Sequence, residues 1–167
     1  MTKYLILFFF ILSVISCSSD KKVSQDINCP ESFVSKDHKN YFSIIDKNAG
    51  DNIDYIAAIN NIKMKCKVNE MNRILSIFDI LFVITPVDPL SKGYEYSYFV
   101  LIFDENDKIL DRQLFKVSGK FDRDENNLAK ETIMIETLDQ YFPSNDNLYS
   151  VGVGFVLTED QYNFINN

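Results

Sequence analysis

The single histidine, His38, limits the catalytic chemistry that this chain of 167 residues can support. A Ser-His-Asp triad, a Cys-His pair or a histidine-rich metal site would each have to include that one imidazole. His38 lies in a charged and polar segment, residues 36–40, which is typical of a solvated loop. We therefore predict no catalytic residue, no metal site and no cofactor, and we do not expect an enzyme. Catalysis by two carboxylates, as in glycoside hydrolysis, stays open as an alternative.

Two acidic clusters resemble the beginning of a calcium-binding loop. Residues 104–107, Asp-Glu-Asn-Asp, place several hard oxygen ligands close together in the sequence. The EF-hand pattern then fails, because Ile109 and Phe115 stand where it needs glycine and glutamate. The second cluster consists of Asp122, Asp124 and Glu125. Solvated turns are the better interpretation of both clusters.

Tyr94, Tyr96 and Tyr98 alternate along one predicted strand and therefore share one of its faces. They are a candidate aromatic platform for a glycan or a peptide. Aromatic rings also stabilise strands by packing, and the chain has 14 Phe and nine Tyr but no Trp, so its rings can equally fill the core. Gly152 and Gly154 share one face of the last predicted strand, which leaves room for a bulge or for a close backbone approach.

An apolar leader ends at residues 14–17, Val-Ile-Ser-Cys. Lys3 supplies a positive charge, and residues 4–15 are apolar except for Ser13, the pattern of a secretory signal peptide. Twelve helical residues reach about 18 Å, which is less than the roughly 30 Å of a bilayer core. The leader is therefore a poor transmembrane helix.

Residues 14–17 resemble the lipobox of bacterial lipoproteins, in which an aliphatic residue stands three places before the cysteine and a small residue directly precedes it. The resemblance implies cleavage between Ser16 and Cys17 and fatty acyl (palmitate) chains on Cys17. Two or three such chains hold a protein on a membrane almost irreversibly. Ser18, in the place where some lipoproteins carry Asp, implies the outer membrane, with the protein facing the periplasm. An ordinary secretory leader, with Cys17 as a bystander, is the alternative.

The predicted mature chain consists of Cys17 with a flexible polar tether, residues 17–28, and a single domain, residues 29–167. Loss of Lys3 with the leader leaves 16 of the 17 basic side chains against 24 acidic ones, a formal charge of −8. Such a balance argues against nucleic acid as a partner. It also predicts that membrane contact comes from the acyl chains alone.

Cys29 and Cys66 are an even pair in a compartment where disulfides persist, so we expect them to be bonded. Closing residues 29–66 into a loop corresponds to about 4 kcal/mol in the chain-entropy description. Two unrelated buried thiols and half of a metal site are the alternatives. A metal site is disfavoured, because the chain has no CxxC spacing and one histidine.

An alternation of apolar and polar residues dominates the domain and predicts strands. The clearest case is residues 62–68, where apolar side chains alternate strictly with lysines. Residues 74–84 are apolar on both faces, apart from Ser76 and Asp79, and should form a central strand with Asp79 at a bulge or as a paired buried acid. Further strands are predicted at 55–59, 94–103, 109–117, 132–138 and 149–157. Residues 158–161 have the form of a capping box before a short helix.

Seven or eight short strands without intervening helices predict an all-β fold, an antiparallel β-sandwich of the immunoglobulin-like or fibronectin-like kind with a short C-terminal helix. The Cys-Pro start at residue 29 and residues 154–161 resemble small uncharacterised lipoproteins of Gram-negative bacteria, which implies no particular activity. The function expected is a lipid-anchored periplasmic binding or envelope-assembly module whose partner is an envelope protein or a glycan. A structural envelope lipoprotein and a carboxylate-based periplasmic hydrolase are the alternatives.

Overall fold

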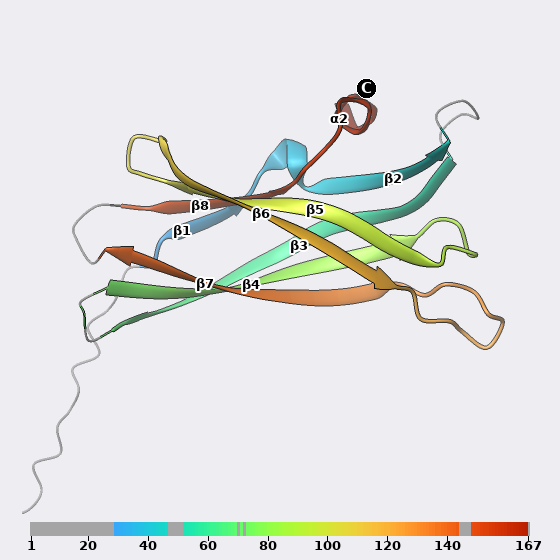
Figure 1. Cartoon of the computed structure of the whole chain (residues 1–167), viewed down its shortest axis with the longest axis horizontal. Coiled ribbons are helices and arrows are strands. Elements are labelled where there is room, and N and C mark those ends of the chain that lie inside the picture. The colour runs from blue at the N-terminus through green and yellow to red at the C-terminus, as the bar shows by residue number, and fades with distance from the viewer. Residues whose placement is uncertain (1–28, 47–51, 70, 72, 144–147, 167) are drawn as a thin grey trace, which may run out of the picture.

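The computed structural model describes residues 29–46, 52–69, 71, 73–143 and 148–166 (Figure 1). The leader, Ser16, Cys17 and the predicted tether lie outside these residues. The described chain is an all-β sandwich with one short C-terminal helix, which confirms the predicted fold class. Its elements are β1 (Glu31–Val34), the 3-10 turn η1 (Lys36–His38), β2 (Asn40–Asp46), β3 (Asn52–Val68), β4 (Arg73–Pro86), β5 (Gly93–Phe103), β6 (Ile109–Lys120), β7 (Thr132–Pro143), β8 (Ser150–Phe155) and α2 (Glu159–Asn166).

Two four-stranded sheets pack face to face. The first has the strand order β1-β8-β5-β6 and the second the order β2-β3-β4-β7. Every neighbouring pair is antiparallel except β1 and β8, which run parallel. Immunoglobulin constant domains instead place strands ABED in one sheet and CFG in the other. The likeness to that fold therefore lies in the two-layer architecture. No helix among the described residues is long and apolar enough to cross a membrane.

Aromatic rings fill much of the space between the sheets. Phe82 of β4 lies near the centre, with its ring centroid 5.4 Å from that of Tyr96, 5.1 Å from that of Tyr98 and 5.8 Å from that of Phe155. The aliphatic side chains that pack around these rings come from β3, β4, β5 and β8, and include Ile59, Ile80, Ile84, Val100 and Val153. Phe and Tyr thus supply the large core side chains of a chain that has no Trp.

The third strand, β3, is longer than the sequence indicates. Residues 55–59 and 62–68, predicted as separate segments around Asn60 and Asn61, belong to one strand of 17 residues. A register shift against β4 falls between Ile59 and Asn61, so Asn60 is the extra residue of a β-bulge instead of part of a turn. After the bulge, Ile62 and Met64 pack against the core, while Lys63 between them faces solvent.

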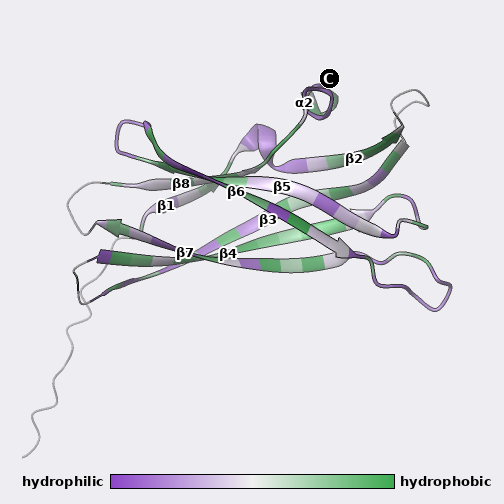
Figure 2. Cartoon of the chain, viewed as in Figure 1, coloured by the Kyte–Doolittle hydropathy of each residue, from purple (hydrophilic) through white to green (hydrophobic). Residues whose placement is uncertain are grey.

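The central position predicted for residues 74–84 is confirmed, since β4 lies between β3 and β7. Its apolar character is visible along the strand in Figure 2. Asp79, however, is neither at a bulge nor a buried acid. Its register with β3 and β7 is regular, opposite Lys63 and Thr137, and its carboxylate accepts a hydrogen bond of 2.8 Å from the Thr137 hydroxyl on the outer face of the sheet.

The two sheets are also joined covalently. Cys29, two residues before β1 of the first sheet, is bonded to Cys66 in β3 of the second sheet, with Cα atoms 5.7 Å apart. The predicted pair thus lies at disulfide-bonding distance.

The C-terminal helix begins with the predicted capping box. The Gln161 backbone N–H donates to the Thr158 hydroxyl at 3.3 Å, and the Thr158 backbone N–H donates to Gln161 Oε1 at 2.9 Å. Gln161 Nε2 also donates to the Phe42 carbonyl oxygen at 2.8 Å, and the Phe164 ring meets the Phe42 ring edge to face. These contacts hold α2 against β2, at the border of the second sheet (Figure 1).

Candidate functional site

The predicted tyrosine platform does not exist as a surface. Tyr96 and Tyr98 are 2% and 0% exposed, and Tyr94 is half-buried with its ring 5.3 Å from that of Phe121. Alternation correctly placed the three rings on one face of β5, but that face points toward the second sheet. The rings pack in the core, so this prediction was wrong.

The buried tyrosines differ in how their hydroxyl groups are satisfied. The Tyr55 hydroxyl accepts a hydrogen bond of 2.8 Å from the Glu95 backbone N–H and donates to the Glu95 carbonyl oxygen. The hydroxyls of Tyr96 and Tyr98 have no hydrogen-bond partner in the described part of the chain. Burial raises the pKa of Tyr55 to about 12 and raises the pKa of Tyr96 and Tyr98 further, with the charge of Glu136 adding to the effect on these last two.

His38 is part of the packed structure and not a solvated loop residue, so that prediction was also wrong. Its side chain is half-buried, and Nδ1 donates a hydrogen bond of 2.9 Å to the Phe155 carbonyl oxygen. The imidazole meets the Phe99 ring at 5.3 Å between centroids. Gly154 lies beneath both side chains, because a Cβ there would stand 2.6 Å from atoms of each. Gly154 thus makes room for two packed side chains, and its pairing with β5 has no bulge.

The two acidic clusters form the same kind of turn. The carboxylate of Asp104 accepts hydrogen bonds from the backbone N–H groups two and four residues later, at 2.9 and 3.0 Å. Asp124 does the same at 2.9 and 2.8 Å. Each turn has one residue in the left-handed region, Asp107 at φ 59° and Asn127 at φ 62°. The described residues contain no group of three or more His, Cys, Asp or Glu side chains arranged to hold a metal ion.

The seventh strand, β7, departs most clearly from ordinary sandwich construction. It is the border strand of the second sheet, and no described strand pairs with its other edge. Its inward positions include Glu136 and Gln140, whereas Ile133 and Ile135 point outward and are 66% and 60% exposed. The other inward side chains follow the usual arrangement, because Met134, Leu138 and Phe142 pack in the core.

The first half of β7 also has few of the features that usually protect a border strand, because the charged side chains of the strand, Glu136 and Asp139, lie in its second half. Its first four residues, 132–135, carry no charge, and its pairing with β4 has no bulge. The border strand of the first sheet, β6, pairs with β5 across a register shift and carries four charged side chains. These are Asp111, Arg112, Lys116 and Lys120. Charges and bulges on border strands prevent pairing with other chains. The first half of β7 is therefore the candidate functional site.

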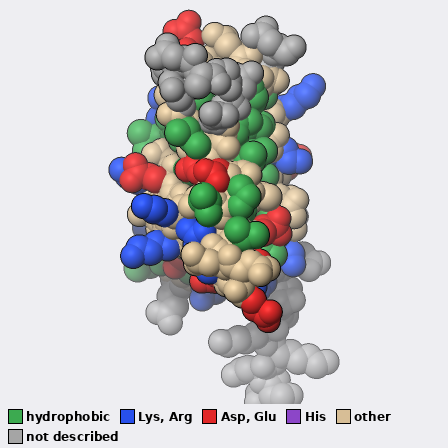
Figure 3. Space-filling model, turned by 90° about the vertical axis from the view of Figure 1, so that its right-hand side faces the viewer, with side chains coloured by type: hydrophobic (Ala, Val, Ile, Leu, Met, Phe, Trp, Pro, Cys, Tyr) green, Lys and Arg blue, Asp and Glu red, His purple; other side chains and the backbone are tan. Residues whose placement is uncertain are grey.

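Apolar side chains continue from β7 to the neighbouring loops. Residues 86–92 and 121–131 lie side by side, because the Ala129 N–H donates to the Pro89 carbonyl at 2.8 Å and the Arg123 guanidinium donates to three backbone oxygens of the first loop. Figure 3 shows hydrophobic side chains gathered on this end of the molecule, between charged ones. We define the distal surface as the exposed side chains of Val87, Leu90, Leu128, Ile133 and Ile135.

No protein-family model, no curated protein and no solved structure matches this chain.

Proposed function

We propose that this chain is a lipid-anchored periplasmic binding module of the cell envelope, and that it binds an extended segment of a partner envelope protein along β7. The observation that carries the proposal is the uncharged and unpaired edge at residues 132–135, with Ile133 and Ile135 exposed beside it. The pattern of the leader, which ends at Cys17, supports the lipid anchor and the periplasmic location.

An extended peptide is the partner that fits such an edge. The free N–H and C=O groups of a border strand pair with a peptide that adds itself as a further strand, about 4.8 Å away. Every second side chain of that peptide would lie on the outer face, next to Ile133 and Ile135. Apolar side chains at those positions would shield both isoleucines from water, and burial of one such side chain contributes about 1.5–3 kcal/mol.

The same geometry favours a protein over a glycan as the partner. Glycan recognition depends on exposed aromatic faces with polar groups around them, and the three tyrosines that suggested this chemistry point into the core. The distal surface is largely aliphatic, which suits contact with apolar protein side chains.

Site-specific photo-crosslinking in living cells tests this proposal. The crosslinking residue replaces Ile133 in one strain and Leu114 of β6 in the other, two positions that are each 66% exposed. We expect one dominant protein adduct from position 133 and none from position 114. The adduct should disappear when Ile135→Lys is added, because a charge beside the edge opposes strand addition. The corresponding change in β6, Arg112→Glu, should leave it unchanged.

Three results would contradict the proposal. Equal adducts from both positions would show that the β7 edge is not special. An adduct with the mass of two copies of this chain would identify a self-association surface. Glycan adducts, or no adduct at either position, would favour wall binding or the structural alternative. The anchor has a separate test. If mass spectrometry finds the protein unacylated and uncleaved at Cys17, the anchor is excluded. The crosslinking result at position 133 still decides whether β7 binds a partner.

A further inference from the structure

Three lysines form a row on the outer face of β3. Lys63, Lys65 and Lys67 are all exposed and occupy alternate positions of a regular strand, so neighbouring members stand roughly 7 Å apart. The residues between them, Met64 and Cys66, point the other way. The row is therefore a consequence of the strict apolar-lysine alternation at residues 62–68. We call Lys63, Lys65 and Lys67 the lysine row.

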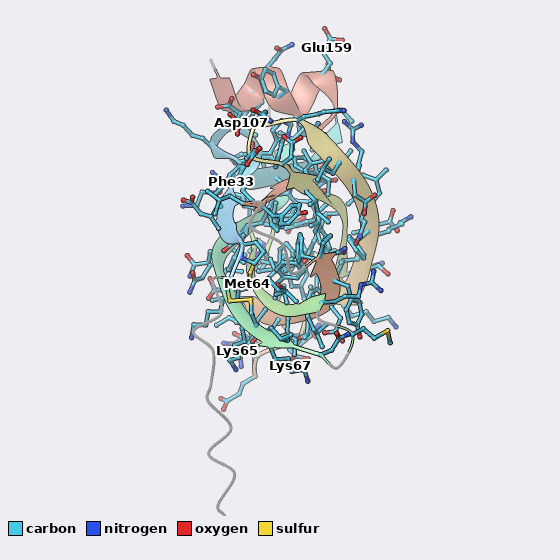
Figure 4. The ribbon with its side chains drawn as sticks, turned by 90° about the vertical axis from the view of Figure 1, so that its left-hand side faces the viewer. Phe33, Met64, Lys65, Lys67, Asp107 and Glu159 are labelled. Carbon is cyan, nitrogen blue, oxygen red and sulfur yellow. A yellow bond between two sulfur atoms is a disulfide. The ribbon has the colours of Figure 1, made fainter. Side chains whose placement is uncertain are left out.

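The lysine row stands at the border of the second sheet. Strand β2 pairs with β3 only as far as Ala58, so the half of β3 that follows the bulge has β4 as its only partner in that sheet. Figure 4 shows Lys65 and Lys67 at one end of the molecule, close to the disulfide. Long lysine side chains at such a border reach outward without a neighbouring strand beside them.

The disulfide places the start of the domain next to this row. Cys66 lies between Lys65 and Lys67 in the sequence and is bonded to Cys29, the first described residue. Any chain that connects Cys29 to Cys17 therefore leaves the domain from beside the row. The twelve residues from Cys17 to Cys29 span at most about 40 Å. An anchor at Cys17 would thus keep the lysine row within about 40 Å of the membrane.

Among the residues that the structure describes, few acidic side chains lie on this part of the outer face. Asp79 lies opposite Lys63 and is hydrogen-bonded to Thr137. Asp139 lies two strands from Lys65, a separation of about 10 Å, which is roughly one Debye length at 0.1 M salt. Arg73, the first residue of β4, adds a further positive charge. The formal charge of −8 is thus an average that conceals a positive region, so it does not support the expectation that the acyl chains alone contact the membrane.

The geometry points to the lysine row as a docking surface for anionic phospholipid in the membrane that carries the anchor. This inference rests on the attachment at Cys17 that the proposed function includes. Each lysine near an anionic leaflet favours the docked state by about fivefold at moderate salt. Three lysines, whose charge Asp79 partly cancels, should therefore make the docked orientation about tenfold or more populated than other orientations.

Amine acetylation followed by mass spectrometry measures this orientation on vesicles. The protein is attached to the vesicles through Cys17. An acylated protein uses its own acyl chains, and an unacylated one is coupled through its thiol to a maleimide lipid. The result therefore does not depend on natural acylation. On vesicles with about one third phosphatidylglycerol, we expect the lysine row to react about tenfold more slowly than on pure phosphatidylcholine. Lys92 and Lys130, in the loops at the other end, should react equally on both.

A pair of charge-matched variants separates the row from general electrostatics. Tyr141 lies on the same outer face, because it pairs with Leu75, which in turn pairs with Lys67. Its nitration should therefore also slow on anionic vesicles. Replacing the lysine row by glutamine should abolish this protection. The control variant Lys92→Gln, Lys116→Gln, Lys130→Gln, with the same change in net charge, should retain it. Acetylation slowed less than fivefold, or equal Tyr141 protection in the two variants, would overturn the inference.

Discussion

Replacement of Tyr98 by phenylalanine should stabilise the domain, although it removes a polar group from a native core. The Tyr98 side chain is fully buried, and its hydroxyl has no hydrogen-bond partner in the described structure. A buried hydroxyl without a partner costs about 1–3 kcal/mol. Phenylalanine keeps the ring, which stacks on Phe115 at 4.9 Å and meets Phe82 at 5.1 Å, so no cavity forms. We expect a gain of about 1 kcal/mol in the free energy of unfolding.

Tyr55→Phe is the matched control with the opposite sign. Tyr55 is as deeply buried, at 3% exposure, but its hydroxyl bonds to both the N–H and the C=O of Glu95. Its removal leaves both backbone groups without that partner and should cost about 1–3 kcal/mol. Urea unfolding with the disulfide intact measures both variants, and their m-values should match that of the wild type. Equal destabilisation by both substitutions would show that the Tyr98 hydroxyl is well bonded and refute the reasoning.

Three further predictions concern pH, packing and the disulfide. Burial raises the pKa of Tyr98 above its unfolded value near 10, so the free energy of unfolding should fall as pH rises above 10. Tyr98→Phe should reduce this loss by about 1.4 kcal/mol per pH unit up to pH 12. Urea unfolding over this pH range measures the difference. Gly154→Ala should lower the melting temperature more than Gly152→Ala, and calorimetry compares the two. The new Cβ at position 154 would meet the Cβ of His38 at 2.6 Å, whereas at position 152 it would meet the outer end of the 43% exposed Phe33 ring at 2.9 Å. Replacing Cys29 and Cys66 together by serine should cost up to about 4 kcal/mol in urea unfolding, and reducing the wild type should reproduce that loss.

Local sequence patterns predicted the features that depend on neighbouring residues alone. The capping box at Thr158 and Gln161 forms because its two hydrogen bonds join residues three positions apart. The turn at residues 104–108 forms because an aspartate carboxylate reaches backbone groups two and four positions ahead. Alternation fixed the two faces of β3 for the same reason. These interactions are complete within a short segment, so the segment specifies them.

Features that depend on distant contacts were not predictable in this way. The neighbours of His38 in the sequence are polar, yet its ring packs on Phe99 and bonds to Phe155, over sixty positions away. Alternation placed Tyr96 and Tyr98 on one face of β5 but could not say that this face meets the second sheet. Which face is buried depends on the order of the strands in both sheets. That order does not follow the sequence, because β8 pairs with β5 and not with β7, the strand before it in the chain.

The two outward isoleucines of β7 argue most strongly that its edge has a function. In an isolated domain, exchanging the inward Glu136 with the outward Ile135 would bury more apolar surface, so stability alone does not account for the observed alternation. The inward polar side chains are partly explained, since Gln140 accepts a hydrogen bond of 2.9 Å from Gln113 of β6 and so links the two border strands. On the outer face, Ile133 and Ile135 stand opposite Val83 and Leu81 of β4, yet they remain 66% and 60% exposed. Their exposure beside an uncharged edge is costly unless another chain covers them, and this is the condition that the proposed partner strand would meet.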